Sequence, residues 1–176
     1  MNDSELIVRA ALDDREAFGL LVQRHQSTVR HFLRHLTRGD AALADDLAQE
    51  TFVQAWRSLV RYHGGSAFST WLLGIAHNQW RNFRRRRQHD SLDDVPGAEP
   101  AVTSTIAQSD LRHDLAAALD HLDPDEQLAL HLAYQQGLSH AEIAALLNWP
   151  VGTVKTHLAR GKNRLRQLLA VWNPPT

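Results

Sequence analysis

The sequence predicts an all-α protein of two small helical domains, joined by a flexible acidic linker, with a helix-turn-helix at the end of the second domain. Alanine and leucine are common while valine and isoleucine are few, which favours helices over strands. Residues 89–109 contain prolines, glycine and acids without a sustained apolar period, which is typical of a linker. We therefore expect domains at residues 1–88 and 110–172, separated by that linker.

The composition of the whole chain narrows the class of protein. No apolar run approaches the roughly 20 residues that cross a membrane, and the acidic N-terminal stretch lacks the apolar core of a signal peptide. With no cysteine there is no disulfide and no thiolate zinc site, so a cytoplasmic location is expected. The net charge of −1 conceals an uneven distribution, since residues 90–126 carry ten acids and one arginine between two basic blocks.

The first domain begins with three amphipathic helices. Apolar positions predict a short helix over residues 6–17 and a longer one over residues 18–36, which ends at a loop, residues 37–40, where glycine takes the left-handed position. A third helix is expected over residues 41–60. Its expected outward side chains are Asp45, Asp46, Gln49, Glu50, Val53 and Arg57. Such a face is usually only solvated, but a valine among these polar groups, with a tryptophan nearby, indicates a protein-binding stripe.

A glycine- and serine-rich loop at residues 62–71 carries several aromatic side chains and leads into a fourth helix over residues 71–88. The expected outward side chains of that helix are His77, Asn78, Arg81, Asn82 and Arg85. The helix ends in four consecutive arginines, which repel one another unless an anion is bound. Aromatic rings beside arginines suit single-stranded nucleic acid, because bases stack on the rings and the cations follow the phosphates. The alternative is that Phe68, Trp71 and Phe83 simply belong to the core.

The second domain is expected to form a helix over residues 110–122, another that starts at Asp123-Pro124, and then a helix-turn-helix. Ser139 followed by Glu142 forms a capping-box pattern, which predicts a helix start. The stretch Asn148-Trp149-Pro150 ends that helix, because asparagine tolerates the left-handed conformation and proline cannot continue a helix. A last helix opens near residues 150–152.

At about 100° per residue, Val154, Leu158, Gly161 and Leu165 share one side of this last helix. The opposite side is small, polar and basic: Gly152, Thr153, Thr156, Ala159, Arg160 and Asn163, with Lys155 at its border and His157 on the other flank. Small side chains permit a close approach to a DNA major groove, while threonine, asparagine and arginine can bond base edges. The alternative is an amphipathic helical hairpin with a solvated basic face.

Three motifs, in their order and spacing, resemble the extracytoplasmic-function (ECF) group of bacterial sigma factors. They are ADDLAQETFVQAW at residues 44–56, FSTWL with IAHN at residues 68–78, and PVGTVKT at residues 150–156. Together they extend over nearly the whole chain. The sequence departs from the family pattern at Asn148, where glycine is usual, at Gly161, where alanine is common, and at Asp123, where leucine commonly precedes the proline.

The resemblance implies that the chain binds RNA polymerase core and directs it to promoters. In that family the helix matching residues 41–60 docks on the clamp coiled coil of the β′ subunit, so the expected contacts with core are Asp46, Gln49, Glu50 and Val53. The loop and helix matching residues 62–87 melt and read the minus-ten element, with candidates Tyr62, Ser66, Phe68, Trp71, His77, Asn78, Arg81, Asn82, Arg84 and Arg85. The helix matching residues 152–166 reads the minus-thirty-five element, with candidates Gly152, Thr153, Lys155, Thr156, His157, Arg160, Asn163 and Arg164.

The implied partners are the β′ clamp and β subunits of RNA polymerase core, promoter DNA as duplex and as melted single strand, and an anti-sigma factor. No catalytic residue, cofactor, metal ion or membrane contact is expected, since the sequence has no phosphate-binding glycine loop, nucleophile elbow or zinc motif. A duplex-only helix-turn-helix regulator with an N-terminal sensing or partner domain is the main alternative. A metal-dependent helical enzyme is a third, resting on His31 and His35 at helical spacing.

Overall fold

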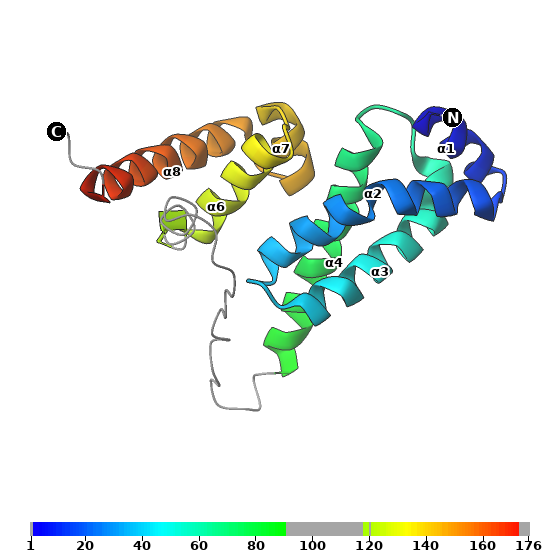
Figure 1. The fold of residues 1–176 in the computed structure, drawn as a ribbon, viewed down its shortest axis with the longest axis horizontal. Helices are drawn as coiled ribbons and strands as arrows, with labels where there is room; N and C mark the ends of the chain where they lie inside the picture. Colours follow the sequence, from blue (N-terminus) through cyan, green and yellow to red (C-terminus); the bar gives the residue numbers. More distant parts are fainter. Residues whose placement is uncertain (1, 91–117, 120, 173–176) are drawn as a thin grey trace. The chain divides into compact units, whose positions relative to one another are not determined.

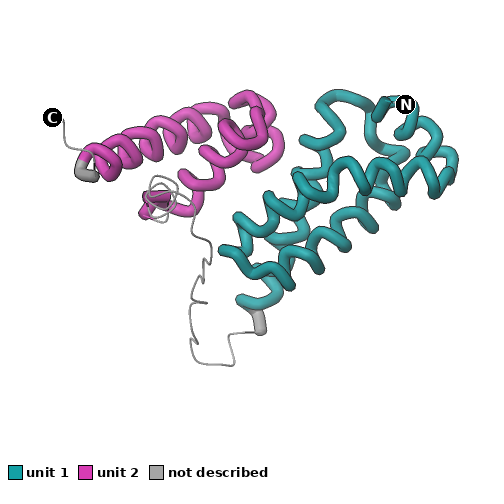
Figure 2. The backbone as a smooth tube through the Cα atoms, viewed as in Figure 1, with its two compact units in different colours: residues 1–102 teal, residues 103–176 magenta. Residues whose placement is uncertain are grey.

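The computed structural model describes residues 2–90, 118–119 and 121–172, and the chain divides into two compact units, residues 1–102 and 103–176 (Figure 2). The regular elements of the described residues are helices, without a strand among them, which confirms the predicted fold class. None of these helices is long and apolar enough to cross a membrane. The predicted linker falls almost entirely outside the described residues, as do residues 110–117 and 120 of the helix predicted after it.

Within residues 2–90, the first unit contains four α-helices: α1 (Asp3–Ala11), α2 (Arg15–Leu36), α3 (Ala41–Ser58) and α4 (Phe68–Asp90). Helix α2 lies against α1, α3 and α4, and α3 also packs along α4 (Figure 1). The side chains that meet between them are almost fully buried and mostly aliphatic: Leu6, Leu21, Val29, Phe32, Leu33, Leu47, Leu59, Leu72 and Leu73. Burial of this apolar surface is what holds α1 and α4 to α2.

The break between α1 and α2 differs from the prediction, which had one helix over residues 6–17. Helix α1 ends at Ala11, and Asp13 takes a left-handed φ of 69° that no α-helix can contain. Asp14 then starts α2 by accepting a hydrogen bond from the backbone N–H of Ala17 at 3.0 Å. The apolar period alone placed the boundary wrongly because it continues across this turn.

The loop predicted between α2 and α3 is confirmed. Arg38 and Gly39 have φ values of 53° and 87°, and the N–H of Gly39 closes the end of α2 on the carbonyl of Arg34 at 2.8 Å. Asp40 caps α3 by accepting from the N–H of Leu43 at 3.0 Å. Helix α3 ends at Ser58, and the chain continues as a single 3₁₀ turn, η1 (Leu59–Arg61).

The second unit contains α6 (Pro124–Leu130), a π-helical turn η2 (His131–Gln135), α7 (His140–Leu147) and α8 (Val151–Trp172). The predicted local signals are confirmed in it. Pro124 occupies the first turn of α6, Ser139 and Glu142 form the capping box of α7, and Asn148 ends α7 with a left-handed φ of 56°. Helices α7 and α8 therefore form the expected helix-turn-helix.

Helix α8 packs against α6 as well as α7, and Gly161 is where it comes close to α6. A Cβ atom on Gly161 would lie 2.8 Å from Leu130 Cδ1 and 3.4 Å from both Glu126 Cβ and Leu122 Cδ2. Val154 and Leu158 are buried on the same side of α8, as predicted. This packing leaves the opposite side of α8 exposed.

Candidate nucleic-acid and protein interfaces

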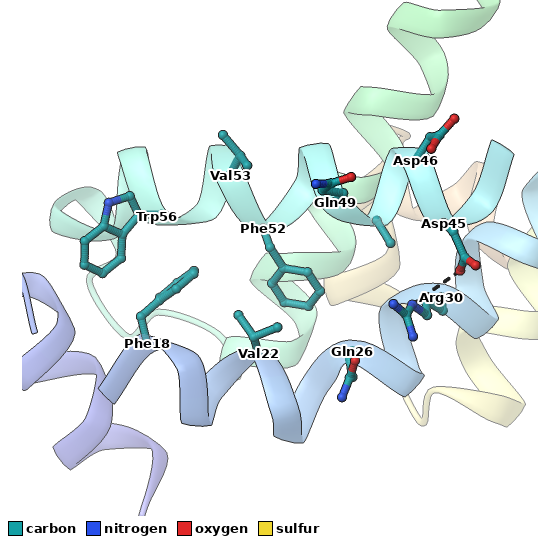
Figure 3. Close-up of a pocket in the computed structure, with 11 residues that line it drawn as sticks. Phe18, Val22, Gln26, Arg30, Asp45, Asp46, Gln49, Phe52, Val53 and Trp56 are labelled. Carbon is teal, nitrogen blue, oxygen red and sulfur yellow. Dashed lines mark ion pairs between the residues drawn. The ribbon is translucent and has the colours of Figure 1, made fainter. Parts of the chain in front are cut away.

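A groove of about 580 Å³ runs between α2 and α3 (Figure 3). Phe18 and Trp56 meet edge-on at one end, with ring centroids 4.9 Å apart. Arg30 Nε and Asp45 Oδ1 form an ion pair of 3.3 Å at the other end. The complete lining is Phe18, Val22, Gln26, Arg30, Asp45, Asp46, Ala48, Gln49, Phe52, Val53 and Trp56.

Three of the four residues predicted to contact polymerase core line this groove: Asp46, Gln49 and Val53. Glu50 is exposed on α3 but is not part of the lining. The side chains from α2 were missed by the sequence analysis, which treated that helix only as core. Phe18 and Val22 lie one turn apart, and this spacing indicates an apolar face of α2. The spacing cannot show that part of this face stays accessible in the folded protein. The arrangement offers an apolar groove with acidic and amide groups along one side.

Three aromatic rings cluster where the loop after η1 joins α4. The centroid of Phe68 lies 5.5 Å from that of Tyr62 and 5.5 Å from that of Trp71, and Tyr62 and Trp71 are 5.2 Å apart. The Tyr62 hydroxyl donates to the Ser66 carbonyl at 2.6 Å. Burial, with a smaller contribution from the Asp3 carboxylate, raises the pKa of Tyr62, which further disfavours loss of the proton that this bond uses. The bond closes the glycine-rich loop.

Two of the candidate minus-ten residues do not face solvent. Phe68 is only 5% exposed, so its ring forms the buried side of the aromatic cluster. His77 was predicted to point outward, and this was wrong: it is 7% exposed and stacks on Trp80 with centroids 5.7 Å apart. Helix α4 also begins at Phe68, three residues before the predicted start. The rotation of α4 is set by its contacts with α2 and α3, which a single-helix projection does not contain.

A second groove, of about 490 Å³, brings together three predicted residues of α4: Trp71, Asn78 and Asn82. The rest of its lining was not predicted and comes from α3, η1 and α4: Gln54, Ser58, Arg61, Ile75 and Gln79. Trp71 provides a ring face, the amides provide donors and acceptors for base edges, and Arg61 provides a cation. The amides of Gln54 and Gln79 were missed because a glutamine in a helix gives no sequence signal of its own.

The arginines of α4 continue from this groove toward the end of the helix. Arg81, Arg84 and Arg85 are exposed. The Arg84 guanidinium lies 5.1 Å from the centroid of the Trp80 ring, and that of Arg87 lies 5.9 Å from the centroid of Phe83. Stacking on a ring holds a guanidinium without neutralising it. This end of α4 is therefore a cationic surface with ordered side chains.

On α8 the exposed side matches the predicted readout face closely. Gly152, Lys155, Thr156, Arg160 and Asn163 are exposed, and Thr153 is half-buried. The Thr156 hydroxyl donates to the carbonyl of Gly152 at 2.9 Å, which leaves its oxygen able to accept from a base or a water. A straight exposed helix with this surface can lie in a DNA major groove.

Two other predicted residues of α8 have partners within the second unit. His157 is half-buried and packs on Trp149, with ring centroids 5.0 Å apart. The Arg164 guanidinium bonds Asp123 at 3.0 Å and the almost fully buried Glu126 at 3.2 Å. The side chain is still 47% exposed, so a contact between Arg164 and DNA stays a prediction. The carboxylates that hold it lie 38 and 41 positions earlier in the sequence, beyond the reach of any local pattern.

The described residues contain no group of three or more histidine or acidic side chains able to hold a metal ion. Family models match both units: Sigma-70 region 2 over residues 21–89 and Sigma-70 region 4 over residues 112–165. The sequence is 32% identical to the ECF RNA polymerase sigma-E factors of Escherichia coli K12 and Salmonella typhimurium LT2, over 94% of this chain and 93% of each of theirs. This chain belongs to the ECF family of sigma factors. The resemblance inferred from three motifs is thereby confirmed.

Two solved structures are similar to this ECF sigma factor, and the first is of a named sigma factor. RpoE of Bartonella quintana, in complex with the anti-sigma factor NepR, has a TM-score of 0.73 and 29% identity, over 88% of this chain and 97% of that one. CnrH, in complex with the cytosolic domain of CnrY, has a TM-score of 0.68 and 28% identity, over 96% and 97%. Family membership gives the chain a role in promoter recognition as a regulatory protein. The individual contact residues and the exact domain boundaries stay predictions.

Proposed function

We propose that this sigma factor binds RNA polymerase core through the groove between α2 and α3, opens and reads the minus-ten element with the aromatic cluster and α4, and reads the minus-thirty-five element as duplex with α8. The observation that carries the proposal is the second groove. Trp71, Asn78 and Asn82 meet there, beside the exposed arginines of α4. A ring face, amides and cations in one place are what an unstacked base and its phosphates require.

The contact with core is argued from the groove between α2 and α3. Its floor is apolar and aromatic, while Asp46 and Gln49 line one side and Glu50 extends the acidic face beyond it. A helix with apolar and basic side chains would bury the floor and pair with these acids. A β′ clamp helix of that chemistry is the partner we propose.

Strand opening in this proposal draws on binding free energy. The sequence has no phosphate-binding glycine loop, so no nucleotide hydrolysis is available to it. Extruding a base costs a few kcal/mol, and stacking on an aromatic ring returns about 1–3 kcal/mol per base. The two nearly cancel, so polymerase must hold the open strand as well. Free sigma factor should therefore bind promoter DNA poorly.

Regulation by an anti-sigma factor is part of the proposal. Both solved relatives described above were determined in complexes, one with a named anti-sigma factor and the other with the cytosolic domain of CnrY. The groove between α2 and α3 is apolar, with Val53 exposed and Phe52 and Trp56 half-buried, so it can bind an apolar segment. An inhibitor bound there would compete with core, because core is proposed to bind the same groove. Such an inhibitor needs apolar side chains and a basic rim.

The deciding experiment is transcription in vitro with purified core polymerase and genomic DNA, followed by mapping of transcript starts. We expect new starts that depend on this chain and share two sequence elements upstream. The duplex-only regulator is the alternative. It would bind DNA without core and would alter transcription only when another sigma factor is supplied. Dependence on another sigma factor would refute the proposal.

A further inference from the structure

A polar contact ties α1 to α2 next to the aromatic cluster. His25 Nε2 and the Asp3 carboxylate are 2.7 Å apart, and Arg24 donates to the other carboxylate oxygen of Asp3 at 2.8 Å. Burial would raise the pKa of Asp3, but the bonds from Arg24 and His25 outweigh it and hold that pKa below its ordinary value. The His25 side chain is only 15% exposed. Its ring is therefore fixed between α1 and the rest of the unit.

The other side of the His25 ring meets the cluster. Its centroid lies 5.3 Å from that of Phe68, with the two planes at 71°, which is an edge-to-face contact. Phe68 in turn contacts both Tyr62 and Trp71. A continuous path of contacts therefore runs from α1 through His25 to the rings at which we propose that the melted strand is held.

The loop between these rings is closed by the bond from Tyr62 to Ser66, and most of its residues are exposed. His63, Gly64, Gly65 and Ala67 are exposed, and Gly64 takes a φ of 72°. Phenylalanine has no polar group, so the orientation of the Phe68 ring depends on the rings that pack against it. Of those rings, His25 also contacts α1, through the 2.7 Å contact between its Nε2 and the Asp3 carboxylate.

We propose that His25 is a positioning residue for strand opening: its ring, only 15% exposed between α1 and the cluster, fixes Phe68 edge-on, and Phe68 sets the rings of Tyr62 and Trp71 for the unstacked base. The proposal rests on the proposed function, in which this cluster opens the minus-ten element. It assigns a role in promoter opening to α1, whose residues lie outside the matched region 2 model. His25 itself does not touch DNA in this proposal.

The test compares two variants that both lose the bond to Asp3. His25→Phe keeps a ring against Phe68, whereas His25→Leu fills a similar volume without one. The measured quantity is the rate of promoter opening by holoenzyme at saturating core, followed by permanganate reactivity of unpaired thymines. We expect His25→Leu to open about two- to tenfold more slowly, the worth of one edge-to-face contact, and His25→Phe to recover most of the rate. Equal rates for the two variants would overturn the proposal.

Arg24→Gln is the matched control for the attachment of α1. It removes a bond to the same carboxylate of nearly the same length, so a general loosening of α1 would slow this variant as well. We expect it to open at the wild-type rate. Circular dichroism and core affinity should be unchanged for all three variants. His25→Leu could lose its fold or its affinity for core while His25→Phe keeps both. In that case His25→Phe is compared with wild type at saturating core. A large loss of opening rate in His25→Phe would contradict the proposal.

A double-mutant cycle tests the path through Phe68. In a Phe68→Leu background, replacing His25 by Leu should cause no further slowing, because the contact it removes is already absent. Full additivity of the two effects would overturn the proposal. Asn78→Ala with Asn82→Ala separates this result from the proposed function. If that double variant opens promoters normally, the proposed function fails. If it does not open them but His25→Leu opens at the wild-type rate, only the positioning role fails.

Discussion

Arg160 and Arg164 lie one turn apart on α8 and are both exposed, but Arg164 is paired with two carboxylates. Arg160 is exposed on the proposed readout face, with Lys155, Thr156 and Asn163. The Arg164 guanidinium bonds a buried carboxylate and an exposed one on the first turn of α6. A charge paired with a buried carboxylate is costly to remove, because the carboxylate is then left without its counter-ion. The two arginines should therefore fail in different assays.

Arg160→Ala should weaken binding at promoters by about 1–3 kcal/mol if its guanidinium makes a bidentate base contact, and should relax preference at one upstream position. Unfolding of the second unit should not change. The measurement is holoenzyme affinity for a set of promoters mutated at single upstream positions. Equal weakening on every sequence would instead show that Arg160 contacts a phosphate, and that a different face of α8 reads the bases.

Arg164→Ala should destabilise the second unit, by up to about 3 kcal/mol, since Glu126 would keep its burial and lose its partner. Urea unfolding followed by circular dichroism would measure this. Arg166→Ala is the matched control, because Arg166 is exposed on the same helix and bonds only the amide of Asn163 among the contacts described. A loss of promoter selectivity without a loss of stability would indicate that Arg164 contacts DNA.

Gly161 decides how closely α8 approaches α6. Gly161→Ala gains helix propensity, about 1 kcal/mol, but its Cβ must displace the end of the Leu130 side chain. We expect these terms to offset, with a net change in unfolding free energy below about 1 kcal/mol. Gly161→Val should cost about 1–3 kcal/mol more, as overpacking usually does. Urea unfolding of both variants measures this; equal stability of the two would show that the helices can separate freely.

At the scale of an element, α3 has one face that packs in the core and one face that is exposed. Ala44, Leu47, Ala48 and Ala55 are buried against its neighbouring helices. The other face exposes acids and Val53, which is 47% exposed. Small inward residues let α3 approach its neighbours closely, so the outer face can change charge without disturbing the core.

Reversing the charge of Asp46 and Glu50 together, to lysine, should weaken binding of core strongly while the circular dichroism spectrum stays the same. The reason is that a basic partner helix would then meet like charges. Glu16→Lys is the control, since Glu16 is an exposed acid on α2 outside the groove lining. Undiminished core affinity of the double variant, measured by fluorescence anisotropy, would refute the proposed contact.

The capping box of α7 supports a prediction about pH. Backbone and side-chain hydrogen bonds with Ser139 lower the pKa of Glu142. A lowered folded-state pKa means that Glu142 contributes stability above its unfolded pKa and loses it as the pH falls through the folded value. Ser139→Ala should cost about 1 kcal/mol at neutral pH and less in acid. Urea unfolding at both pH values measures this, and a cost independent of pH would contradict the linkage.

At the scale of the whole molecule, the division into two units allows the proposed promoter opening to be tested separately from the proposed duplex readout. Changing Asn78 and Asn82 to alanine should abolish opening by holoenzyme but leave selectivity at the upstream element unchanged, because α8 belongs to the other unit. A template already mismatched across the minus-ten region should restore part of the activity. Permanganate reactivity at a mapped promoter measures this, and normal opening of the duplex would favour the duplex-only regulator.

Local signals in the sequence determined the ends of several elements correctly. Asp123-Pro124, the Ser139–Glu142 box and Asn148 each act on neighbouring backbone groups within four residues. Their effects therefore need no knowledge of the fold. The all-helical class and the family were also readable, because apolar periodicity and three spaced motifs are properties of the chain itself.

Tertiary structure decided which side chains are accessible. His77 is buried by the packing of α4, Phe18 and Val22 join the groove beside α3, and the exposed Arg164 is paired with Asp123 and Glu126. Each of these outcomes depends on how helices distant in sequence rotate and approach one another. The rotation of each helix is fixed by the apolar surface that it buries against its neighbours, and the sequence of one helix does not specify those neighbours.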